Sequence, residues 1–430
     1  MFRTVLATFA GLLLAPASLF AAEKAEPAGS APSPSPSAPG ASLRDDWIDP
    51  DTGHRVVRLS RLPGNSESFC FHQNAFTREG DKFVFSNTTE GARNRLFVLD
   101  WASRKLASLT ESGAAGAVVS PSTRKVYYQR AGALYWTHLD SLETKKIAQL
   151  PFGWSAATVN ADDTLLAGTF VDGGSRIDRS GPRSEWFDQT FEAKRPQCLF
   201  TVEVSTGKTN IFYRYEGWLG HIQFSPADPR LLMFCHEGPW HKLDRIWHIR
   251  TDGTGLRLIH ERTVTNEIAG HEFWSADGKM VWFDLQMPRG QKFFLAGVPV
   301  SDSDADLKSK TPSGSSRPSG SANNKEIRYP IERDQWSVHF NISRDGKLFA
   351  GDGGAPKMVA HAQDGKWIYL FTPQASGTLQ AERLVNMAKH NYALEPNVNF
   401  APDNKWIVFR GNFDGGPQVY AVEVAANPGK

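Results

Sequence analysis

The sequence is poor in cysteine and lacks any long amphipathic helical pattern. Its three cysteines, Cys70, Cys198 and Cys235, lie in strand-like runs beside large apolar residues. An odd number leaves at least one free thiol, so we expect buried small hydrophobic residues and no disulfide framework. No long segment carries a clean 3.6-residue apolar period, whereas strand and turn residues dominate. The predicted class is therefore all-β.

Charge and motifs exclude further classes of function. The formal net charge is +2, and no tract rich in lysine and arginine is present to follow a phosphate backbone. This argues against broad nucleic-acid binding but not against a local basic patch for an acidic ligand. The chain has no Gly-x-Ser-x-Gly elbow and no phosphate-binding glycine loop. A propeller-capped peptidase is therefore not expected.

The N-terminal region resembles an export signal. Residues 1–22 contain Arg3, an apolar run from Val5 to Phe20, and then Ala21 and Ala22. The run is short for a membrane span, so we interpret it as a cleaved signal peptide and expect no span in the mature chain. Residues 23–44 are rich in Ala, Pro, Ser and Gly and are predicted to be a flexible spacer. The protein is expected to be exported, to the periplasm or the medium.

A strand–turn–strand unit recurs along the rest of the chain. In residues 270–285, Asp277 and Gly278 form a turn between two apolar strands, because Asp can bond its own backbone and Gly accepts positive φ. Seven such units begin at Phe76, Val119, Val159, Phe224, Gly270, Ile342 and Phe400. Most are followed by a second pair of strand-like segments. Repeated four-stranded sheets indicate the blades of a β-propeller.

We therefore predict one domain, residues 45–430, folded as a seven-bladed propeller. The last repeat supplies only about three strands, and an unpaired edge there would be unfavourable. The early strand-like run His54–Leu59 has no repeat of its own, so it is predicted to complete the final blade and close the ring. Residues 301–325 interrupt the fifth repeat and are predicted to be a disordered insertion.

Histidines recur where the first strand of a repeat begins. Such positions are held by His72, His221, His271 and His339, while His390 shortly precedes Glu395 and Asn397. First strands line the channel of a propeller, so these side chains can converge. A single histidine in an aromatic-rich sheet is most often a packed residue with one backbone hydrogen bond. Recurrence at matched positions favours a shared pocket, whereas for His236 the two interpretations are about equal.

Four segments together resemble the oligogalacturonate lyase family: Gly220–Phe224, Phe234–Pro239, Gly270–Trp274 and Gly351–Gly353. The resemblance covers nearly the whole mature chain. It implies a seven-bladed propeller that binds a divalent cation, typically Mn²⁺, and cleaves short pectic oligomers by β-elimination. The implied substrate is an acidic, uronate-containing oligosaccharide.

The resemblance also implies roles for particular residues. The catalytic base falls on His221, the first metal-binding histidine on His271, and the arginine that neutralises the substrate carboxylate close to Arg195. In the seventh repeat the family has a glutamine followed by His-Pro-His, where this chain has Tyr392, Glu395 and Asn397. Glu395 and Asn397 would then be oxygen ligands, which favour Mn²⁺, Mg²⁺ or Ca²⁺.

Six residues are predicted to bind substrate: His72, His236, His339, His390, Tyr392 and Arg410. If the changed ligands no longer hold a metal, several of these could bind substrate carboxylates directly. The alternative hypothesis is a non-catalytic exported propeller that binds carbohydrate or protein partners. It predicts that His221→Ala would leave binding nearly intact.

Overall fold

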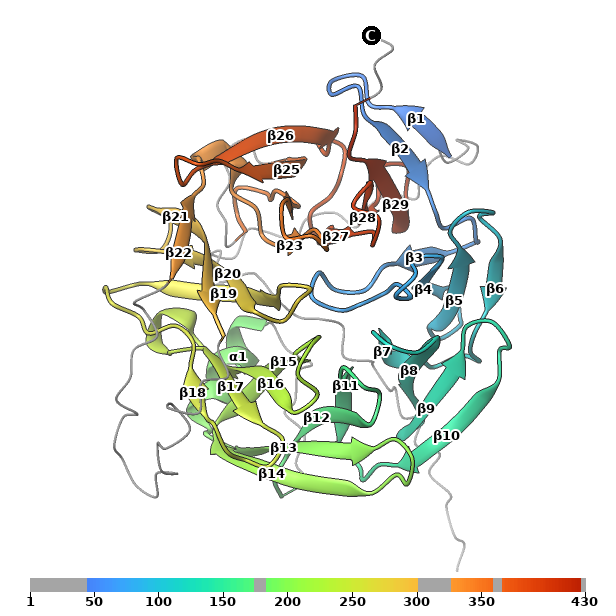
Figure 1. Ribbon diagram of the computed structural model, residues 1–430, viewed down its shortest axis with the longest axis vertical. Coiled ribbons are helices and arrows are strands. Elements are labelled where there is room, and N and C mark those ends of the chain that lie inside the picture. Colours follow the sequence, from blue (N-terminus) through green and yellow to red (C-terminus); the bar gives the residue numbers. More distant parts are fainter. Residues whose placement is uncertain (1–44, 174–182, 301–325, 359–365, 427–430) are drawn as a thin grey trace, which may run out of the picture.

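Seven antiparallel sheets surround a central axis in the computed structural model (Figure 1), which describes residues 45–173, 183–300, 326–358 and 366–426. The seven-bladed propeller predicted from the repeats is confirmed. The predicted signal peptide, spacer and disordered insertion lie outside the described residues.

The first three blades follow one another in sequence. Blade one contains β3 (Asn65–Glu67), β4 (Lys82–Thr88), β5 (Arg95–Asp100) and β6 (Leu106–Ser108). Blade two contains β7 (Ala115–Val119), β8 (Lys125–Arg130), β9 (Ala133–His138) and β10 (Thr144–Gln149). Blade three contains β11 (Ser155–Val159), β12 (Leu165–Val171), β13 (Pro196–Glu203) and β14 (Thr209–Glu216). Each first strand is the innermost of its sheet.

Blades four to six repeat this arrangement and carry most of the histidines discussed below. Blade four contains β15 (Trp218–Phe224), β16 (Leu231–Glu237), β17 (Ile246–Arg250) and β18 (Arg257–Leu258). Blade five contains β19 (Ile268–Trp274), β20 (Met280–Gln286), β21 (Phe293–Pro299) and β22 (Ile327–Pro330). Blade six contains β23 (Phe340–Ile342), β24 (Phe349–Gly351), β25 (Trp367–Pro373) and β26 (Leu379–Asn386).

The seventh blade joins the two ends of the domain. Its sheet has the order β1–β2–β29–β28–β27, with β1 (Asp46–Ile48), β2 (Arg55–Arg58), β27 (Asn399–Phe400), β28 (Trp406–Gly411) and β29 (Gln418–Glu423). Strand β2 pairs with β29, Val57 opposite Ala421. The predicted closure by the segment around His54–Leu59 is confirmed. The extra outer strand β1 was not predicted.

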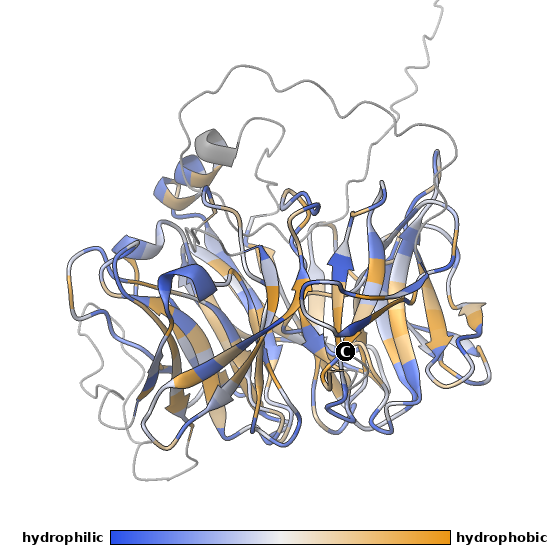
Figure 2. Ribbon diagram, turned by 90° about the horizontal axis from the view of Figure 1, so that it is seen from above, coloured by the Kyte–Doolittle hydropathy of each residue, from blue (hydrophilic) through white to orange (hydrophobic). Residues whose placement is uncertain are grey.

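One helix, α1 (Arg183–Glu192), is inserted between β12 and β13 and stands out from one face of the ring (Figure 2). Trp186 and Phe187 pack against Trp218, with ring centroids 6.1 and 5.4 Å apart. Trp218 begins β15 and is paired with Glu237. The helix therefore lies over the end of blade four. No helix in the described parts of the chain is both long and apolar enough to cross a membrane.

Aromatic and aliphatic side chains fill the space between the sheets. Phe83, Phe200, Phe234 and Phe283 are fully buried, and the same faces of neighbouring blades supply valine and leucine. Cys70, Cys198 and Cys235 are all buried, and none of the three forms a disulfide. Burial raises the pKa of the Cys198 and Cys235 thiols, so both behave as small apolar residues.

Candidate active site

Two histidines occupy the same unusual backbone position in the neighbouring strands β15 and β19. Both strands have a bulge, between Gly220 and Gln223 in β15 and between Gly270 and Phe273 in β19. The residue after the glycine has φ of 48° in His221 and 47° in His271. In β7 the matching place of the bulge is held by Gly116, with φ of 60°.

A side chain in this left-handed region costs about 1–2 kcal/mol, which glycine avoids. Because the bulge itself can be built with glycine, as Gly116 shows, the fold does not require histidine there. Bulges commonly redirect a side chain beside an active site. The strain at His221 and His271 therefore points to a functional reason for the imidazoles.

The glycines before the two histidines leave room for two other side chains. A Cβ atom at Gly220 would overlap the carboxylate side chain of Glu237, and one at Gly270 would overlap the ring of Trp240. Trp240 lies in the short helix Trp240–Lys242, which follows β16. These two neighbours hold the same residue, Arg245, between them. The glycines of the Gly-His pairs noted in the sequence thus make room for two side chains that pack around an arginine.

Arg245 was not predicted to belong to the site. Its Nη1 donates to Oε2 of Glu237 at 2.9 Å, and its guanidinium carbon lies 4.2 Å from the centre of the Trp240 ring. The side chain is 1% exposed, yet Nε and Nη2 have no hydrogen-bond partner among the described residues. Burial disfavours its charged form, but the carboxylates of Glu237 and Glu272 outweigh this and raise the pKa of Arg245. A buried, permanently charged group thus has one edge without a hydrogen bond, and Nη2 on that edge lies 3.7 Å from the Glu272 carboxylate.

The sequence does contain a signal for this arginine. Arg245 directly precedes the buried residue Ile246, which starts β17. A charge placed inside a sheet needs a partner or a ligand, because leaving water is costly for an ion. Arg195, the predicted neutralising residue, is half-buried just before β13. Its role is untested and stays a prediction.

Histidine–carboxylate pairs repeat in blades five and six. Nδ1 of His271 is 2.7 Å from Oδ1 of Asp284, and Nδ1 of His339 is 2.7 Å from Oδ2 of Asp352. In each pair the carboxylate lies on the second strand or directly after it. A carboxylate at Nδ1 fixes the ring and leaves Nε2 to act as a base or a metal ligand. Nε2 of His271 is buried and has no hydrogen-bond partner among the described residues.

The two imidazoles differ in protonation. Burial lowers the pKa of His271, and Asp284 offsets this only in part. Burial also disfavours the charged form of His339, but the negative charges of Asp352 and Glu395 outweigh it and raise the pKa of His339. Of the two rings, His271 is therefore the one that loses its proton at the lower pH.

A loop from blade one brings these residues together. Residues 68–75, between β3 and β4, reach toward the centre of the ring (Figure 1). There Phe71 stacks on His339 with ring centroids 4.7 Å apart and lies 5.9 Å from His271 and 6.3 Å from His221. The ring centroid of His72, the next residue in the chain, lies 5.0 Å from that of His221. The predicted convergence of four histidines at the channel is thus present in the fold.

One group of potential metal ligands was not expected. In the described part of the chain, ligand atoms of His221, Cys235 and Glu272 all lie within 4.8 Å of one another. However, Nδ1 of His221 is hydrogen-bonded to Glu272, and Arg245 Nη2 lies 3.7 Å from the same carboxylate. Burial and Glu272 raise the pKa of Cys235 well above its usual value, so the thiol stays protonated. We interpret this group as a hydrogen-bonded unit and not as a metal centre.

His339 and Glu395 are better placed to hold a cation. Nε2 of His339 lies 3.7 Å from Oε2 of Glu395, a separation that two ligands of one ion can have, and Asp352 holds Nδ1 as for a ligating histidine. Imidazole nitrogen and carboxylate oxygen suit a divalent cation such as Mn²⁺. The residues present therefore fit the implied cation. His271 lies next to this pair, with its ring centroid 4.7 Å from that of His339.

Asn397 forms hydrogen bonds beside the pair of His339 and Glu395. Its Oδ1 accepts from the Phe71 amide at 3.1 Å, and its Nδ2 donates to the Glu395 carbonyl at 3.2 Å. Its backbone amide donates to Asp352 at 3.1 Å. The predicted ligand role of Asn397 stays a prediction.

Four residues predicted to bind substrate contact protein groups. The His236 ring stacks on the Tyr215 ring with centroids 3.8 Å apart, and burial lowers the pKa of His236 to about 3. The His390 ring forms a hydrogen bond with the Leu394 carbonyl, and the Tyr392 hydroxyl donates to the Asp352 carbonyl. The Arg410 guanidinium donates to the Ser68 carbonyl. These contacts support the loops around the pocket. Whether the four residues also touch substrate is untested.

A family model described as oligogalacturonate lyase matches residues 43–320, more than half of the chain. The chain is similar to an oligogalacturonide lyase of Pectobacterium atrosepticum, with 28% identity over 88% of this chain and 95% of the relative. It is also similar to an oligogalacturonate lyase of Dickeya dadantii, with 27% identity and the same coverage.

Solved structures show the same fold. One, an oligogalacturonate lyase in complex with manganese, has a TM-score of 0.72 and 24% identity, covering 89% of this chain and 96% of that one. Another, an oligogalacturonate lyase from Vibrio parahaemolyticus, has a TM-score of 0.73 and 23% identity, with the same coverage.

Proposed function

Because the chain belongs to the oligogalacturonate lyase family, we propose that it cleaves uronate-containing, pectic oligosaccharides by β-elimination. One observation carries the proposal: buried Arg245 has an edge without hydrogen bonds, and Trp240, which packs on it, also contacts His271, a buried histidine whose Nε2 has no hydrogen-bond partner among the described residues. A guanidinium edge binds a carboxylate through two parallel hydrogen bonds. A neutral imidazole can accept a proton.

The chemistry requires these two groups together. The C5 proton of a uronate is α to a carboxylate, and its removal builds further negative charge on that group. Arg245 would bind the carboxylate and offset the charge as it forms, in a site shielded from water. Nε2 of His271 would take the proton, while Asp284 holds Nδ1 and stabilises the imidazolium. The bond from C4 to O4 then breaks.

This proposal places the base at His271, whereas the sequence resemblance placed it at His221. Two features favour His271. Its pKa is lowered by burial, which keeps Nε2 unprotonated, and Trp240 contacts both its ring and Arg245. Likewise, Arg245 takes the neutralising role first assigned near Arg195. Variants of His221 and His271 can distinguish the two assignments.

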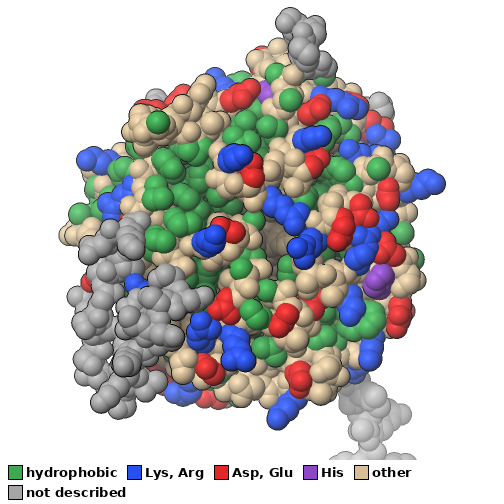
Figure 3. Space-filling model, viewed as in Figure 1, with side chains coloured by type: hydrophobic (Ala, Val, Ile, Leu, Met, Phe, Trp, Pro, Cys, Tyr) green, Lys and Arg blue, Asp and Glu red, His purple; other side chains and the backbone are tan. Residues whose placement is uncertain are grey.

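A divalent cation of the Mn²⁺ class would be held by His339 and Glu395, with Asn397 as a further candidate ligand. When bound, it would supply positive charge to the uronate carboxylate. Asp352 fixes the His339 ring for this task, and Phe71 stacks on that ring. Lysine and arginine side chains also lie beside the hollow at the centre of one face (Figure 3), where they would attract an acidic oligomer.

The test is direct. Purified protein is freed of metal with a chelator, supplied with Mn²⁺ or left without it, and mixed with oligogalacturonides. Formation of the C4=C5 bond is followed by ultraviolet absorbance. We expect a rise that Mn²⁺ increases, and His271→Gly should lower the rate by about 100-fold or more. Glycine suits the positive φ at this position, so the variant should fold.

Two results would contradict the proposal. The first is no absorbance rise with any uronate oligomer, with or without metal. If oligomers still bound, the alternative of a binding propeller would be favoured. The second is full activity of His271→Gly combined with loss of activity in His221→Gly, which would return the base to His221.

We also propose that the protein acts outside the cytoplasm, because residues 1–22 resemble a signal peptide. Fractionation of cells that express the full chain should give a product lacking these residues in the periplasm or medium. A full-length product in the cytoplasm would contradict this.

A further inference from the structure

A cleft between blades one and two shares no residue with the channel site. The two blades are neighbours in the ring (Figure 1). The cleft has a volume of about 420 Å³, within the range of about 300–1000 Å³ that is usual for small-ligand sites. Its walls carry two arginines, one carboxylate and several hydroxyl groups, among them those of Arg95, Ser108, Thr110, Glu111, Tyr128 and Arg130.

Blade one forms one wall of the cleft, and main-chain bonds fix it. Arg95 begins β5. Leu109, directly after β6, donates from its amide to the Leu96 carbonyl at 2.9 Å, and the Leu96 amide donates to Oγ1 of Thr110 at 3.0 Å. These two bonds hold the segment after β6 against the start of β5. The hydroxyl groups of that segment and the guanidinium of Arg95 are therefore carried on one rigid edge of the blade.

Blade two supplies the second arginine. Tyr128 and Arg130 are two residues apart in β8, so their side chains lie on one face of the strand. Tyr128 stacks on Tyr135 of β9 with ring centroids 5.7 Å apart, and the guanidinium carbon of Arg130 lies 5.2 Å from the centre of the Tyr135 ring. Nη1 of Arg130 also donates to Oε2 of Glu111 in blade one at 2.5 Å. The ion pair and the aromatic contact together fix this guanidinium between the two blades.

Positive charge exceeds negative charge in and beside the cleft. Arg95 has no side-chain hydrogen bond or ion pair within the described chain, and Arg130 has one carboxylate partner, Glu111, which is 85% exposed. A third arginine runs alongside: a Cβ atom at Gly113 would lie 3.8 Å from Cδ of Arg93 and 3.9 Å from Cγ of Arg130. Water screens the exposed carboxylate, so the cleft attracts an anion.

The arginines of the cleft lie at the same face of the ring as Arg245. All blades have the same up-and-down strand order, so every second strand ends, and every third strand begins, at one face. Arg130 ends β8 and Arg95 begins β5, just as Glu237 ends β16 and Arg245 directly precedes β17. An acidic oligomer that approaches this face therefore meets both the cleft and the channel site.

We propose that this cleft is a second, non-catalytic site for an acidic sugar, in which Arg95 and Arg130 bind the carboxylate of one uronate residue; the choice of a uronate rests on the proposed function. Guanidinium groups form strong, directed hydrogen bonds with a carboxylate. The carboxylate of Glu111 can accept hydrogen bonds from sugar hydroxyls, and the Ser108 hydroxyl can donate or accept. Glu111 also repels a compact anion such as sulfate, which has no hydroxyl to offer it. The lining therefore suits a sugar that carries a single carboxylate.

Hydrogen exchange followed by mass spectrometry observes the cleft and the channel separately. The wild type and Arg95→Gln are treated with a chelator and labelled with trigalacturonide, with the neutral trisaccharide of galactose, or with sulfate. We expect trigalacturonide to slow exchange in peptides that cover residues 108–113 and 128–132, and the neutral sugar to have no effect there. Arg95→Gln should raise the concentration that gives half protection by about 10-fold or more, because a charged hydrogen bond is lost. An unchanged concentration would overturn the proposal, and protection by sulfate equal to that by trigalacturonide would overturn the assignment to a sugar.

Arg214→Gln is the matched control. Arg214 lies in β14, the outer strand of blade three, where it is bonded to both Asp172 and Glu216 and does not line the cleft. This variant should keep wild-type protection at the cleft, and a loss equal to that in Arg95→Gln would mean that total charge attracts the oligomer, which would overturn the proposal. Arg95 has no side-chain partner in the described chain to lose, so Arg95→Gln should unfold at the wild-type temperature.

The two proposals can fail separately. Protection of the cleft by trigalacturonide without any elimination by the wild type would refute the proposed function and support this site. Elimination by the wild type without protection of the cleft would overturn this site alone. Arg95→Lys keeps the charge but not the planar guanidinium, so it should retain part of the protection that Arg95→Gln loses. Equal losses in the two variants would contradict a role of the charge at this position.

Discussion

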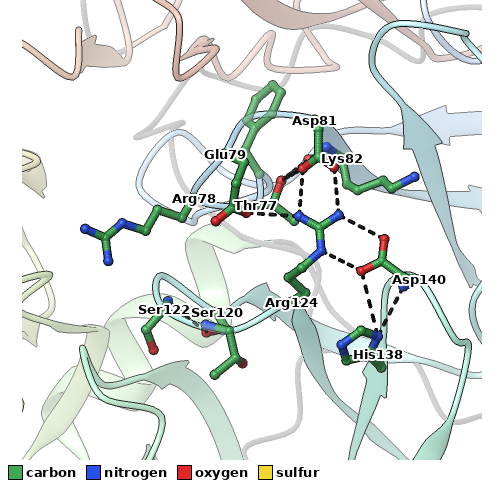
Figure 4. A network of polar contacts seen from close by, with 12 residues as sticks. Thr77, Arg78, Glu79, Asp81, Lys82, Ser120, Ser122, Arg124, His138 and Asp140 are labelled. Atoms are coloured by element: carbon green, nitrogen blue, oxygen red, sulfur yellow. Dashed lines mark hydrogen bonds and ion pairs between the residues drawn. The ribbon is translucent and has the colours of Figure 1, made fainter.

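Two arginines of the ring show how differently one side chain can be used. Arg124, in the turn between β7 and β8, donates all five N–H groups to Glu79, Asp81 and Asp140 (Figure 4). Arg245, directly before β17, donates one hydrogen bond to Glu237, and its Nε and Nη2 have none within the described chain. Arg124 is 27% exposed, whereas Arg245 is 1% exposed.

The difference separates structural from functional groups. An exposed guanidinium has water as an alternative partner, so a complete set of carboxylates around it adds little stability. A buried guanidinium with an unbonded edge is costly and is retained only where something else uses that edge. Two buried histidines show the same contrast, since carboxylates bond both nitrogens of His260 but only Nδ1 of His271. The following changes test whether incomplete hydrogen bonding marks the site.

The largest effect is expected for Arg245→Lys. Lysine keeps the positive charge beside Glu237 and Glu272 but lacks the planar edge that binds a carboxylate at two points. We expect kcat/KM on oligogalacturonides to fall by about 100- to 1000-fold, with a small change in unfolding temperature. Initial rates and thermal unfolding measure the two effects. A rate close to that of the wild type would show that the unbonded edge does not contact substrate.

Gly270→Ala should cause the next largest loss of activity. The new Cβ would overlap the ring of Trp240, which holds Arg245 and contacts His271. Forcing an extra carbon into packed surroundings costs about 1–3 kcal/mol, and displacement of Arg245 should lower kcat. Chemical denaturation and initial rates measure both.

The double variant Gly270→Ala/Trp240→Leu is the matched control. Leucine removes the ring that the new Cβ would meet, so stability should recover while activity stays low because Arg245 has lost its platform. Recovery of both would mean that Trp240 does not position the arginine. Recovery of neither would mean that the overlap lies elsewhere.

The sequence was informative where structure repeats and uninformative where it does not. The Asp-Gly turns and apolar strands predicted seven blades, and the unpaired run near His54 predicted the closure. Histidines at matched places predicted that His72, His221, His271 and His339 would converge. Arg245 was missed because its buried state depends on Glu237 and Trp240, which no local pattern connects to it. The carboxylates at Nδ1 were missed for the same reason.

A moderate, pH-dependent effect is expected at His260. Its Nδ1 and Nε2 each lie 2.7 Å from a carboxylate, of Glu326 and Glu267, and Arg328 also contacts Glu326. Burial disfavours the charged ring, but the two carboxylates outweigh it and raise the pKa of His260. Its contribution to stability is therefore complete below its unfolded-state pKa of about 6.5 and is lost as pH rises through the raised folded-state value.

The carboxylates of Glu267 and Glu326 set the acid limit of the pH range in which this cluster stabilises the fold. Burial disfavours their ionisation, but His260 and other hydrogen-bond donors lower the pKa of Glu267 and Glu326, so their contribution is lost as pH falls below about 4.5. The free energy of unfolding should be largest between these limits. His260→Gln should abolish the decline on the alkaline side, worth about 1.4 kcal/mol for each unit of raised pKa. Denaturation curves from pH 4 to 9 measure this, and parallel pH profiles of both proteins would contradict it.

The smallest effect is expected for Arg124→Gln, although it removes more hydrogen bonds than any change above. Glu79, Asp81 and Asp140 are about half exposed and regain water when the guanidinium is lost, so the free energy of unfolding should fall by about 1 kcal/mol or less. Salt should reduce the difference between variant and wild type, as measured by denaturation at low and high ionic strength. Lyase activity should not change. A loss of activity approaching that of Arg245→Lys would mean that the number of bonds, and not the edge left unbonded, identifies an arginine on which this propeller depends.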